Sequence, residues 1–279
     1  MIGGVLLVVA AAISWGTWSL FVRPTELPAT VTGPIVFAIM GVATLPFALR
    51  APRVRWDRAL VTLLVANAAL DALNVITFFA AFAYASVAVA VLTHYLAPVV
   101  VALAAERIDG ARTPGARPAA AVAFLGLAIV LAPTRAVPAS ELAGAALGTA
   151  SACCYAGNVF VVRRLAARLG AARQLSYHAL VAAIAMLPLV ALAGDVRVRA
   201  VDLAYLGAGA LVPGAAAGIA FAVGLGRIGS ARAAILAYVE PLVAVTVGAL
   251  AWDEPVRPTA ALGGALVVAA GVHVARSAR

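Results

Sequence analysis

Apolar blocks of about 20 residues, separated by short polar joints, run along the whole chain. A helix needs about 20 apolar residues to cross roughly 30 Å of hydrocarbon. Division of the chain at charged residues, Pro and Gly predicts ten membrane-spanning helices. They cover residues 2–22, 30–49, 59–81, 83–104, 117–133, 141–162, 176–193, 201–223, 231–251 and 258–275. The division between the third and fourth spans requires a very tight turn in FAAFAYASVAVAV.

The composition supports an all-α integral membrane protein. Hydrophobic residues make up 65% of the 279 positions and charged residues 11%, with a mean hydropathy of +1.07. These values exclude an ordinary water-soluble fold. The net charge of +9 comes from arginines that lie between apolar blocks, so it does not indicate a nucleic-acid partner.

The arginines also predict the orientation. With both termini in the cytoplasm, the outer joints hold only Arg23, Arg135, Arg197, Arg199 and Arg257. The inner joints then hold Arg50, Arg53, Arg55, Arg58, Arg107, Arg112, Arg117, Arg163, Arg164, Arg168, Arg173, Arg227, Arg232, Arg276 and Arg279. The positive-inside rule therefore favours an even number of crossings and a multi-pass protein of the inner membrane. The N-terminal block lacks a basic start, so we interpret it as a retained helix and not as a signal peptide.

Self-comparison indicates an internal repeat. Residues 3–23 align with 143–163 and residues 117–130 with 257–270 at a shift of 140, and residues 90–98 align with 233–241 at a shift of 143. We therefore predict two five-helix repeats, at 1–135 and 140–279, within one membrane domain. An odd number of helices in each half inverts the second copy, as in many secondary transporters. The alternative is that Ala/Gly/Leu-rich helices resemble one another by composition alone.

The order of several landmarks resembles the EamA-type branch of the drug/metabolite transporter superfamily over essentially the whole chain. The landmarks are the Trp15–Gly16 pair, a proline in the fourth and ninth spans (Pro98, Pro241) and an acidic residue that closes each span (Glu106, Glu254). Pro98 and Glu106 are closer together than Pro241 and Glu254, which predicts that the fourth helix ends early. The resemblance implies transport of amino acids, other small metabolites or drugs, without choosing among them.

Four residues of the third span share one helix face, which we interpret as part of a substrate site. Asn67, Asp71, Asn74 and Phe78 lie at i, i+4, i+7 and i+11. Their counterparts at a shift of 143 are Ala210, Gly214, Ala217 and Phe221, a small and smooth surface. The predicted binding cavity is therefore asymmetric.

Ionisable residues inside predicted spans are candidates for proton coupling. Asp71 and Glu240 each cost roughly 3 kcal/mol to insert at membrane depth, so a functional role is the first hypothesis. His94 could relay protons near neutral pH. The alternative is that either acid pairs with His94, His178 or an interfacial arginine only to hold helices together. For His178, close to the predicted start of its span, we favour an interfacial position.

Aromatic and amide residues complete the predicted substrate site. Trp15 and Trp18 correspond to Tyr155 and Asn158 in the second half, and could line a cleft between the halves or, especially Trp18, belong to an interfacial aromatic belt. Tyr95 and Tyr238, each before a proline, could hydrogen-bond a substrate or a neighbouring carbonyl.

Other residues in the spans are assigned to packing and movement. Pro98 and Pro241 are expected to kink their helices. Gly214 and Gly218 form a small-residue face, which we interpret mainly as packing and as a gate surface. The adjacent Cys153 and Cys154 are interpreted as packing residues.

A secondary transporter of a small metabolite such as an amino acid, an exporter coupled to protons, is the function that these features favour. The lipid bilayer and a small-molecule substrate are the expected partners of a monomer or weak homo-oligomer, with no cofactor or metal. A membrane-embedded enzyme or flippase for a lipid-linked substrate is the alternative, although the sequence has no HExxH, GxSxG or P-loop motif. A channel is disfavoured because polarity is concentrated in one half.

Overall fold

The structure of the chain is a computed structural model that describes residues 2–110, 112–131, 139–191, 193–256 and 258–276. All regular structure in these residues is helical. Nine helical segments among them are long and apolar enough to cross a membrane, and the shorter apolar helix α7 makes a tenth. The predicted all-α membrane fold of about ten helices is confirmed.

The first half of the chain forms five spans, two of them broken. Their elements are α1 (Ile2–Trp15) with α2 (Ser19–Val22) and the 3-10 turn η1 (Arg23–Thr25); α3 (Ala29–Arg50); α4 (Arg58–Tyr84); α5 (Val87–His94) with α6 (Ala97–Asp109); and α7 (Ala116–Leu131).

The second half forms the other five spans. A 3-10 turn, η2 (Ala139–Glu141), leads into α8 (Leu142–Leu169). The remaining elements are α9 (Ala171–Ala191); α10 (Ala200–Gly209), η3 (Ala210–Ala216) and α11 (Ala217–Ile228) as one span; α12 (Ser230–Leu236) with α13 (Val239–Trp252); and α14 (Thr259–Arg276).

The sixth span differs most from its predicted bounds at a single end, and the fourth, seventh and eighth spans each differ by five residues at one end. The sixth continues to Leu169 instead of residue 162, and the seventh begins at Ala171 instead of residue 176. Charged residues mark where the hydrocarbon region ends and not where a helix ends. The aliphatic part of an arginine side chain can cover apolar surface while its guanidinium group remains solvated. Gly170 alone joins the two helices, at a φ of 79° that few other residues adopt.

The fourth helix does not end early, so that prediction was wrong. α6 runs to Asp109 and α13 to Trp252, each eleven residues beyond its proline. Glu106 lies inside α6 and pairs with Arg112 at 2.6 Å. The acidic residue therefore does not mark the end of this helix.

Three spans depart from a continuous α-helix where proline removes a backbone donor. The fourth span breaks at Tyr95 and Leu96 before Pro98, and the ninth at Ala237 and Tyr238 before Pro241. In the eighth span, η3 is a π-helical segment around Pro213. Neighbouring helices make such breaks tolerable inside a membrane.

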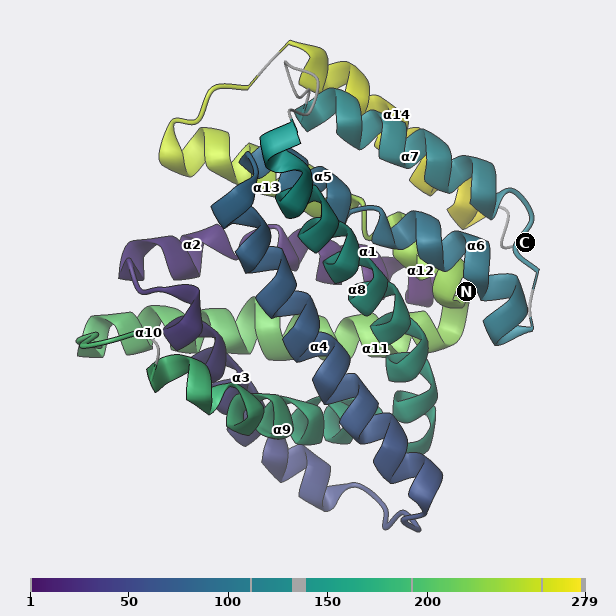
Figure 1. Ribbon diagram of the computed structural model, residues 1–279. Helices are drawn as coiled ribbons and strands as arrows, with labels where there is room; N and C mark the ends of the chain where they lie inside the picture. The colour runs from purple at the N-terminus through teal and green to yellow at the C-terminus, as the bar shows by residue number, and fades with distance from the viewer. Residues whose placement is uncertain (1, 111, 132–138, 192, 257, 277–279) are drawn as a thin grey trace.

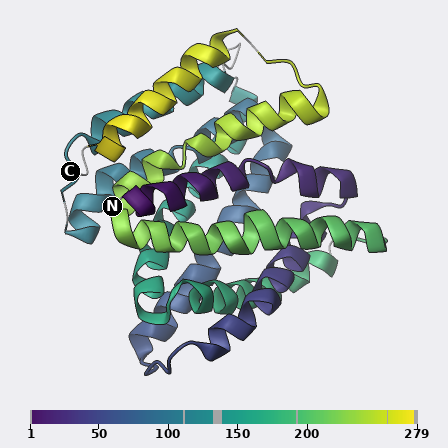
Figure 2. The ribbon, with the colours of Figure 1, turned by 180° about the vertical axis from the view of Figure 1, so that it is seen from behind.

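Helices of the two halves pack in an exchange pattern. α3 packs on α9, α6 on α12 and α7 on α14, so equivalent spans meet one another. α4, the third span of the first half, packs on α8, the first span of the second half. α1 and α11 make the same contact with the halves exchanged, because α1 is the first span of its half and α11 belongs to the third span of the other. Figures 1 and 2 show the α7–α14 pair at one edge and α3 with α9 at the other. The fold therefore interleaves its halves.

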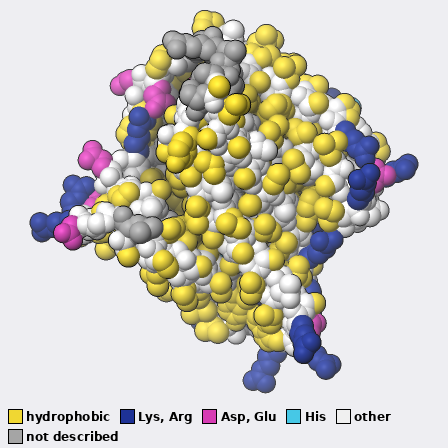
Figure 3. All heavy atoms as spheres, viewed as in Figure 1, with side chains coloured by type: hydrophobic (Ala, Val, Ile, Leu, Met, Phe, Trp, Pro, Cys, Tyr) yellow, Lys and Arg dark blue, Asp and Glu magenta, His cyan; other side chains and the backbone are white. Residues whose placement is uncertain are grey.

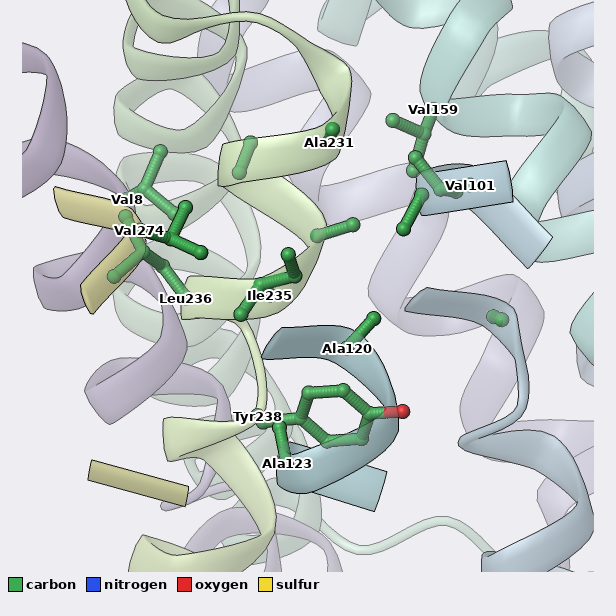
Figure 4. Packing of buried hydrophobic residues seen from close by; sticks show 14 of the residues in the cluster. Val8, Val101, Ala120, Ala123, Val159, Ala231, Ile235, Leu236, Tyr238 and Val274 are labelled. Carbon is green, nitrogen blue, oxygen red and sulfur yellow. The ribbon is translucent and has the colours of Figure 1, made fainter. Parts of the chain in front are cut away.

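Buried small residues fill the contact between the broken spans and the α7–α14 pair. Figure 4 shows the ring of Tyr238 beside Ala120 and Ala123 of α7, with Ile235 and Leu236 above it. Tyr238, Ala120 and Ala123 are all inaccessible to solvent. The break in the ninth span is therefore packed against α7.

The face seen in Figure 3 is mostly apolar, with arginine and acidic side chains gathered toward its edges. The ends of the chain lie on the same side (Figure 1), and we call the end of the bundle that holds them the terminal face and the other the distal face. Arg163 and Arg168 lie at the terminal face, where α8 ends, and Arg23 at the distal face, where the first span ends. Arg135, Arg257 and Arg279 lie outside the described residues.

Candidate functional site

The polar face of α4 meets α8 and α9 at the middle of the bundle. Asn67 is completely buried, and Asp71, one turn further, keeps 19% of its side chain exposed. Both residues hydrogen-bond across to the second half of the chain, as does Asn74. The face predicted from spacing thus forms one wall of an interhelical polar network.

Asp71 is the acceptor on which this network converges. Its Oδ2 lies 2.7 Å from Nε2 of His178, and its Oδ1 accepts a longer 3.5 Å bond from the Asn158 amide. Asn67 donates to Asn158 Oδ1 at 2.6 Å and accepts from Gln174 Nε2 at 2.7 Å. Because an ionised carboxylate only accepts, every donor in this chain points toward the charge of Asp71.

His178 is buried in the network and does not lie at a membrane interface, so the interfacial position favoured from the sequence was wrong. Only 5% of the residue is exposed, and Phe37 meets its ring edge-on with centroids 5.9 Å apart. If Asp71 is ionised, Nε2 carries a proton. The other ring nitrogen, Nδ1, is buried without a hydrogen-bond partner among the described residues.

A second group of polar contacts surrounds Ser151 of α8. Its hydroxyl lies 2.7 Å from Oδ1 and 3.1 Å from the carbonyl oxygen of Asn74, and 2.8 Å from Nδ1 of His94. Because the single hydroxyl proton points to Asn74, Nδ1 of His94 is the donor to the serine oxygen. Phe78 packs on the His94 ring at 4.3 Å, which holds the imidazole in place.

The breaks in the fourth and ninth spans bring Tyr95, Tyr238 and Glu240 together. The Tyr238 hydroxyl donates to the Tyr95 carbonyl at 2.8 Å, and the two rings lie 6.2 Å apart. The Tyr95 side chain hydrogen-bonds the carboxyl group of Glu240, in the first turn of α13. The carboxyl group thus sits beside aromatic rings from both halves.

Trp15 lies near this group, whereas Trp18 lies apart from it. The Trp15 ring contacts Phe221 of α11 at 4.9 Å, and both belong to the central apolar cluster together with Tyr155. Tyr155 lies 5.7 Å from the His94 ring. Trp18 instead packs in a separate cluster with Val36 and Met40 of α3. Its assignment to the substrate site stays a prediction.

The glycines assigned to a gate surface lie at close helix contacts. A side chain at Gly214 would meet Met40 at 2.9 Å, and one at Gly218 would meet Leu175 at 3.2 Å. These glycines let α3 and α9 approach the eighth span, as the packing interpretation expects.

Ser151, Gln174 and His178 are the members of the network that the sequence analysis did not select. Gln174 and His178 are spaced i, i+4 on α9, and Ser151 precedes Tyr155 and Asn158 at i, i+4 and i+7 on α8. This helical spacing was a signal that could have placed each of them on a polar face, although it does not tell which helix that face meets. Tertiary packing alone pairs them with α4 and α5.

An apolar recess of about 750 Å³ lies elsewhere, between α1 and α11, and is lined by residues such as Leu6, Ala10 and Val223. Arg227 stands at one end of it. Because it is open and none of the polar network lines it, we do not identify it with the candidate site.

Comparison with known proteins places the chain in a family. Residues 142–275 match the model of the EamA-like transporter family. A protein of Archaeoglobus fulgidus named an uncharacterized transporter is 33% identical over 275 residues, which cover 96% of this chain and 94% of the relative. A solved crystal structure shares the fold with a TM-score of 0.86, at 19% identity and 98% coverage of each chain. The chain therefore belongs to the EamA-like transporter family of the drug/metabolite transporter superfamily, as a multi-pass membrane transporter.

Proposed function

We propose that this transporter is a proton-coupled secondary exporter of a small amine-bearing metabolite, such as an amino acid. The observation that carries the proposal is the polar network at mid-depth, in which α4 and α5 of the first half bond to α8 and α9 of the second. A buried network between halves changes its bonds whenever the halves move against each other, and binding sites of such transporters lie at this interface.

The chemistry around the breaks matches an amine on an apolar body. Asp71 and Glu240 are the two carboxyl groups that an amine could meet here, and both lie within electrostatic range of Tyr155 in the aromatic group. Rings of Trp15, Phe221 and Tyr155 offer the face for the rest of the molecule and for cation–π contact with the amine. The network contains no arginine or lysine.

Proton coupling is assigned to the Asp71–His178 pair, with His94 and Glu240 as further candidates. Protonation of Asp71 removes the charge toward which the donors point and weakens the 2.7 Å contact to His178. The unpartnered Nδ1 of His178 can take a proton without breaking another hydrogen bond. A substrate amine and a proton would then compete for the same carboxylate, which couples their movements.

Alternating access would arise from the two repeats, 1–135 and 140–279, whose helices exchange roles in the packing. We assign the terminal face to the cytoplasm of the inner membrane, because the arginine excess lies there. Reporter fusions to the C-terminus and to the joint after α3 test this orientation: a cytoplasmic reporter should be active at both, and activity of a periplasmic reporter would reverse it.

The test of transport uses purified protein in liposomes. Counterflow of a mixed amino-acid and metabolite library into these vesicles is measured by mass spectrometry. Empty vesicles give the background. One class of amine should accumulate with the wild-type protein, and an imposed pH gradient should drive it. Asp71→Asn should lose the gradient-driven part, whereas Glu106→Gln, which alters a carboxyl group paired at the surface, should retain it.

Three outcomes decide the proposal. Accumulation in wild type and Glu106→Gln but not in Asp71→Asn supports transport through the network. Accumulation of a compound with unchanged gradient dependence in Asp71→Asn contradicts proton coupling at this residue. No accumulation of any compound by folded protein contradicts the metabolite assignment and favours the lipid-linked substrate alternative.

A further inference from the structure

Two ion pairs cross between the halves of the chain at opposite ends of the bundle. At the distal face, Arg23 of η1 bonds Glu254, just beyond α13, with Nη1 and Oε1 2.6 Å apart. At the terminal face, Arg163 of α8 bonds Asp109, the last residue of α6, also at 2.6 Å. Each pair joins the first span of one half to the fourth span of the other.

The two pairs occupy equivalent places in the repeats. Arg23 aligns with Arg163 at the shift of 140, and the two end the aligned segments 3–23 and 143–163. At the shift of 143, Asp109 aligns with Trp252. Trp252 is itself a partner of Arg23, whose guanidinium carbon lies 5.0 Å from the indole centroid. When the two halves are exchanged, the Arg23–Glu254 contact therefore corresponds approximately to the Arg163–Asp109 contact.

Further bonds reinforce each contact locally. The Trp252 indole donates to Ser19 Oγ at 3.2 Å, which ties α13 to α2 at the distal face. Arg164 donates to the Ile108 carbonyl at 2.8 Å, which ties α8 to α6 at the terminal face. A third pair across the halves, Arg168 with Asp57, joins α8 to the start of α4 at the terminal face. Its equivalent position, Ala200 for Asp57, carries no charge.

We propose that Arg23–Glu254 and Arg163–Asp109 are the two latches of the transport cycle, one at each face, and that each is released in the state open to its own side. The inference rests on the proposed alternating access. Because the latches cross between the halves at opposite ends, a rocking motion that opens one face stretches one latch and leaves the other closed. In the present structure both latches are formed, so the structure corresponds to a state tied at both faces.

The latches differ in strength. Half of each side chain is exposed in the Arg23–Glu254 pair (52% and 52%), whereas Asp109 keeps only 7% of its side chain exposed. Screening by salt acts mainly on exposed pairs. High ionic strength should therefore release the distal latch more readily than the terminal latch.

The experiment measures both faces independently of any cargo. Spin labels are placed at Arg107 and Ala167 for the terminal face and at Glu26 and Val256 for the distal face, all exposed positions, after replacement of Cys153 and Cys154 by Ala. Distances are recorded by double electron–electron resonance in liposomes. Because no substrate is required, a failed transport assay and a failed latch are distinguishable.

Removal of each latch should open only its own face. Glu254→Gln should raise the long-distance population at the distal face about two- to fivefold, the range of one exposed ion pair. Asp109→Asn should raise this population at the terminal face by at least as much, because Asp109 is almost buried. Charge exchange within a pair (Arg163→Asp with Asp109→Arg; Arg23→Glu with Glu254→Arg) should restore the wild-type distances. In these variants folding is checked by thermal melting.

Two ion pairs that are each confined to one half serve as controls. Glu106→Gln at the terminal face and Arg199→Gln at the distal face should leave all distances unchanged. The latch assignment is overturned if Asp109→Asn and Glu254→Gln affect the same face, affect both faces together, or leave the distances as the controls do. Failure of the charge-exchanged variants to restore the distances would also overturn it.

Discussion

At the residue scale, Asn67 shows how one buried side chain holds three helices. Its amide donates to Asn158 of α8 and accepts from Gln174 of α9, and none of its surface is exposed. A buried amide that loses its partner pays the cost of desolvation without compensation. The network is therefore both a candidate site and a structural element of the interface.

Replacement of Asn67 by Leu should lower stability by about 1–2 kcal/mol, because Asn158 and Gln174 each lose a bonding partner inside the membrane. The measurement is thermal or denaturant unfolding of the protein in detergent. Thr77→Val is the matched control on the same helix, because the Thr77 hydroxyl bonds only its own helix backbone. Equal melting of Asn67→Leu and Thr77→Val would show that the amide network does not stabilise the interface.

The two sides of this network were not equally predictable from residues alone. The α4 side was predictable because Asn67, Asp71, Asn74 and Phe78 recur at helical spacing and mark one face. The opposing side was predictable only in part, because Ser151 lies at helical spacing with Tyr155 and Asn158, and Gln174 with His178, but spacing does not tell which helix each face meets. His178 was misassigned because α9 begins five residues earlier than charge and hydropathy indicate, which carries the imidazole into the bundle.

At the element scale, the α7–α14 pair depends on close backbone contact. A side chain at Gly126 would meet the Gly263 carbonyl oxygen at 2.6 Å, and one at Gly263 would meet the Gly126 carbonyl. Small residues that let backbones approach are the usual basis of helix association in membranes. Gly264, the next residue, faces only Leu242 at an ordinary 3.8 Å.

Gly263→Ala and Gly126→Ala should each destabilise the protein by about 1–3 kcal/mol, because an added methyl group forces two helix backbones apart. Gly264→Ala is the control and should melt at or above the wild-type temperature, since Ala favours a helix by roughly 1 kcal/mol over Gly. The measurement compares the melting temperatures of the three variants in detergent. Comparable destabilisation of Gly264→Ala and Gly263→Ala would contradict backbone contact as the cause.

Along each helix, the sequence pattern predicts some features and the packing determines others. The prolines predict where the fourth and ninth spans break, since a missing donor acts locally. Repeat comparison misjudged the end of the fourth helix, because a helix terminus depends on what the last turn packs against. α6 continues to Asp109, and that residue is held by Arg163 of α8.

At the scale of the whole molecule, ion pairs between distant segments connect the two halves. Asp57 begins α4, accepts from the Leu60 amide at 2.7 Å and bonds Arg168 at the end of α8 at 2.6 Å. The Arg168 hydrogen bond, followed by the Leu60 backbone bond, lowers the pKa of Asp57 below its ordinary value of 3.8. Its stabilising effect is therefore present above pH 3.8 and is lost as the pH falls through the lowered pKa.

Asp57→Asn should lower the melting temperature modestly near neutral pH, because Asn still caps the helix but cannot pair with Arg168. Melting is measured in detergent from about pH 7 down to about pH 2, and the difference between variant and wild type should shrink below pH 3.8, where the wild-type carboxylate becomes protonated. A difference that persists unchanged into acid would mean that the charge of Asp57 is not its cause.

The sequence by itself determined the class of fold, the number of crossings, the breaks in the fourth and ninth spans and one polar helix face. These follow from local rules: hydrocarbon thickness sets the length of an apolar block, proline removes a donor, and helical spacing places Asn67 and Asp71 on one side.

The tertiary structure decided which groups meet. It joined Asp71 to His178, packed Trp18 against α3, and placed Arg23 beside Glu254 and Arg163 beside Asp109. Such contacts join residues far apart in the chain, 107 positions apart for Asp71 and His178. They depend on how ten helices pack at once, and no periodicity within one helix contains that information.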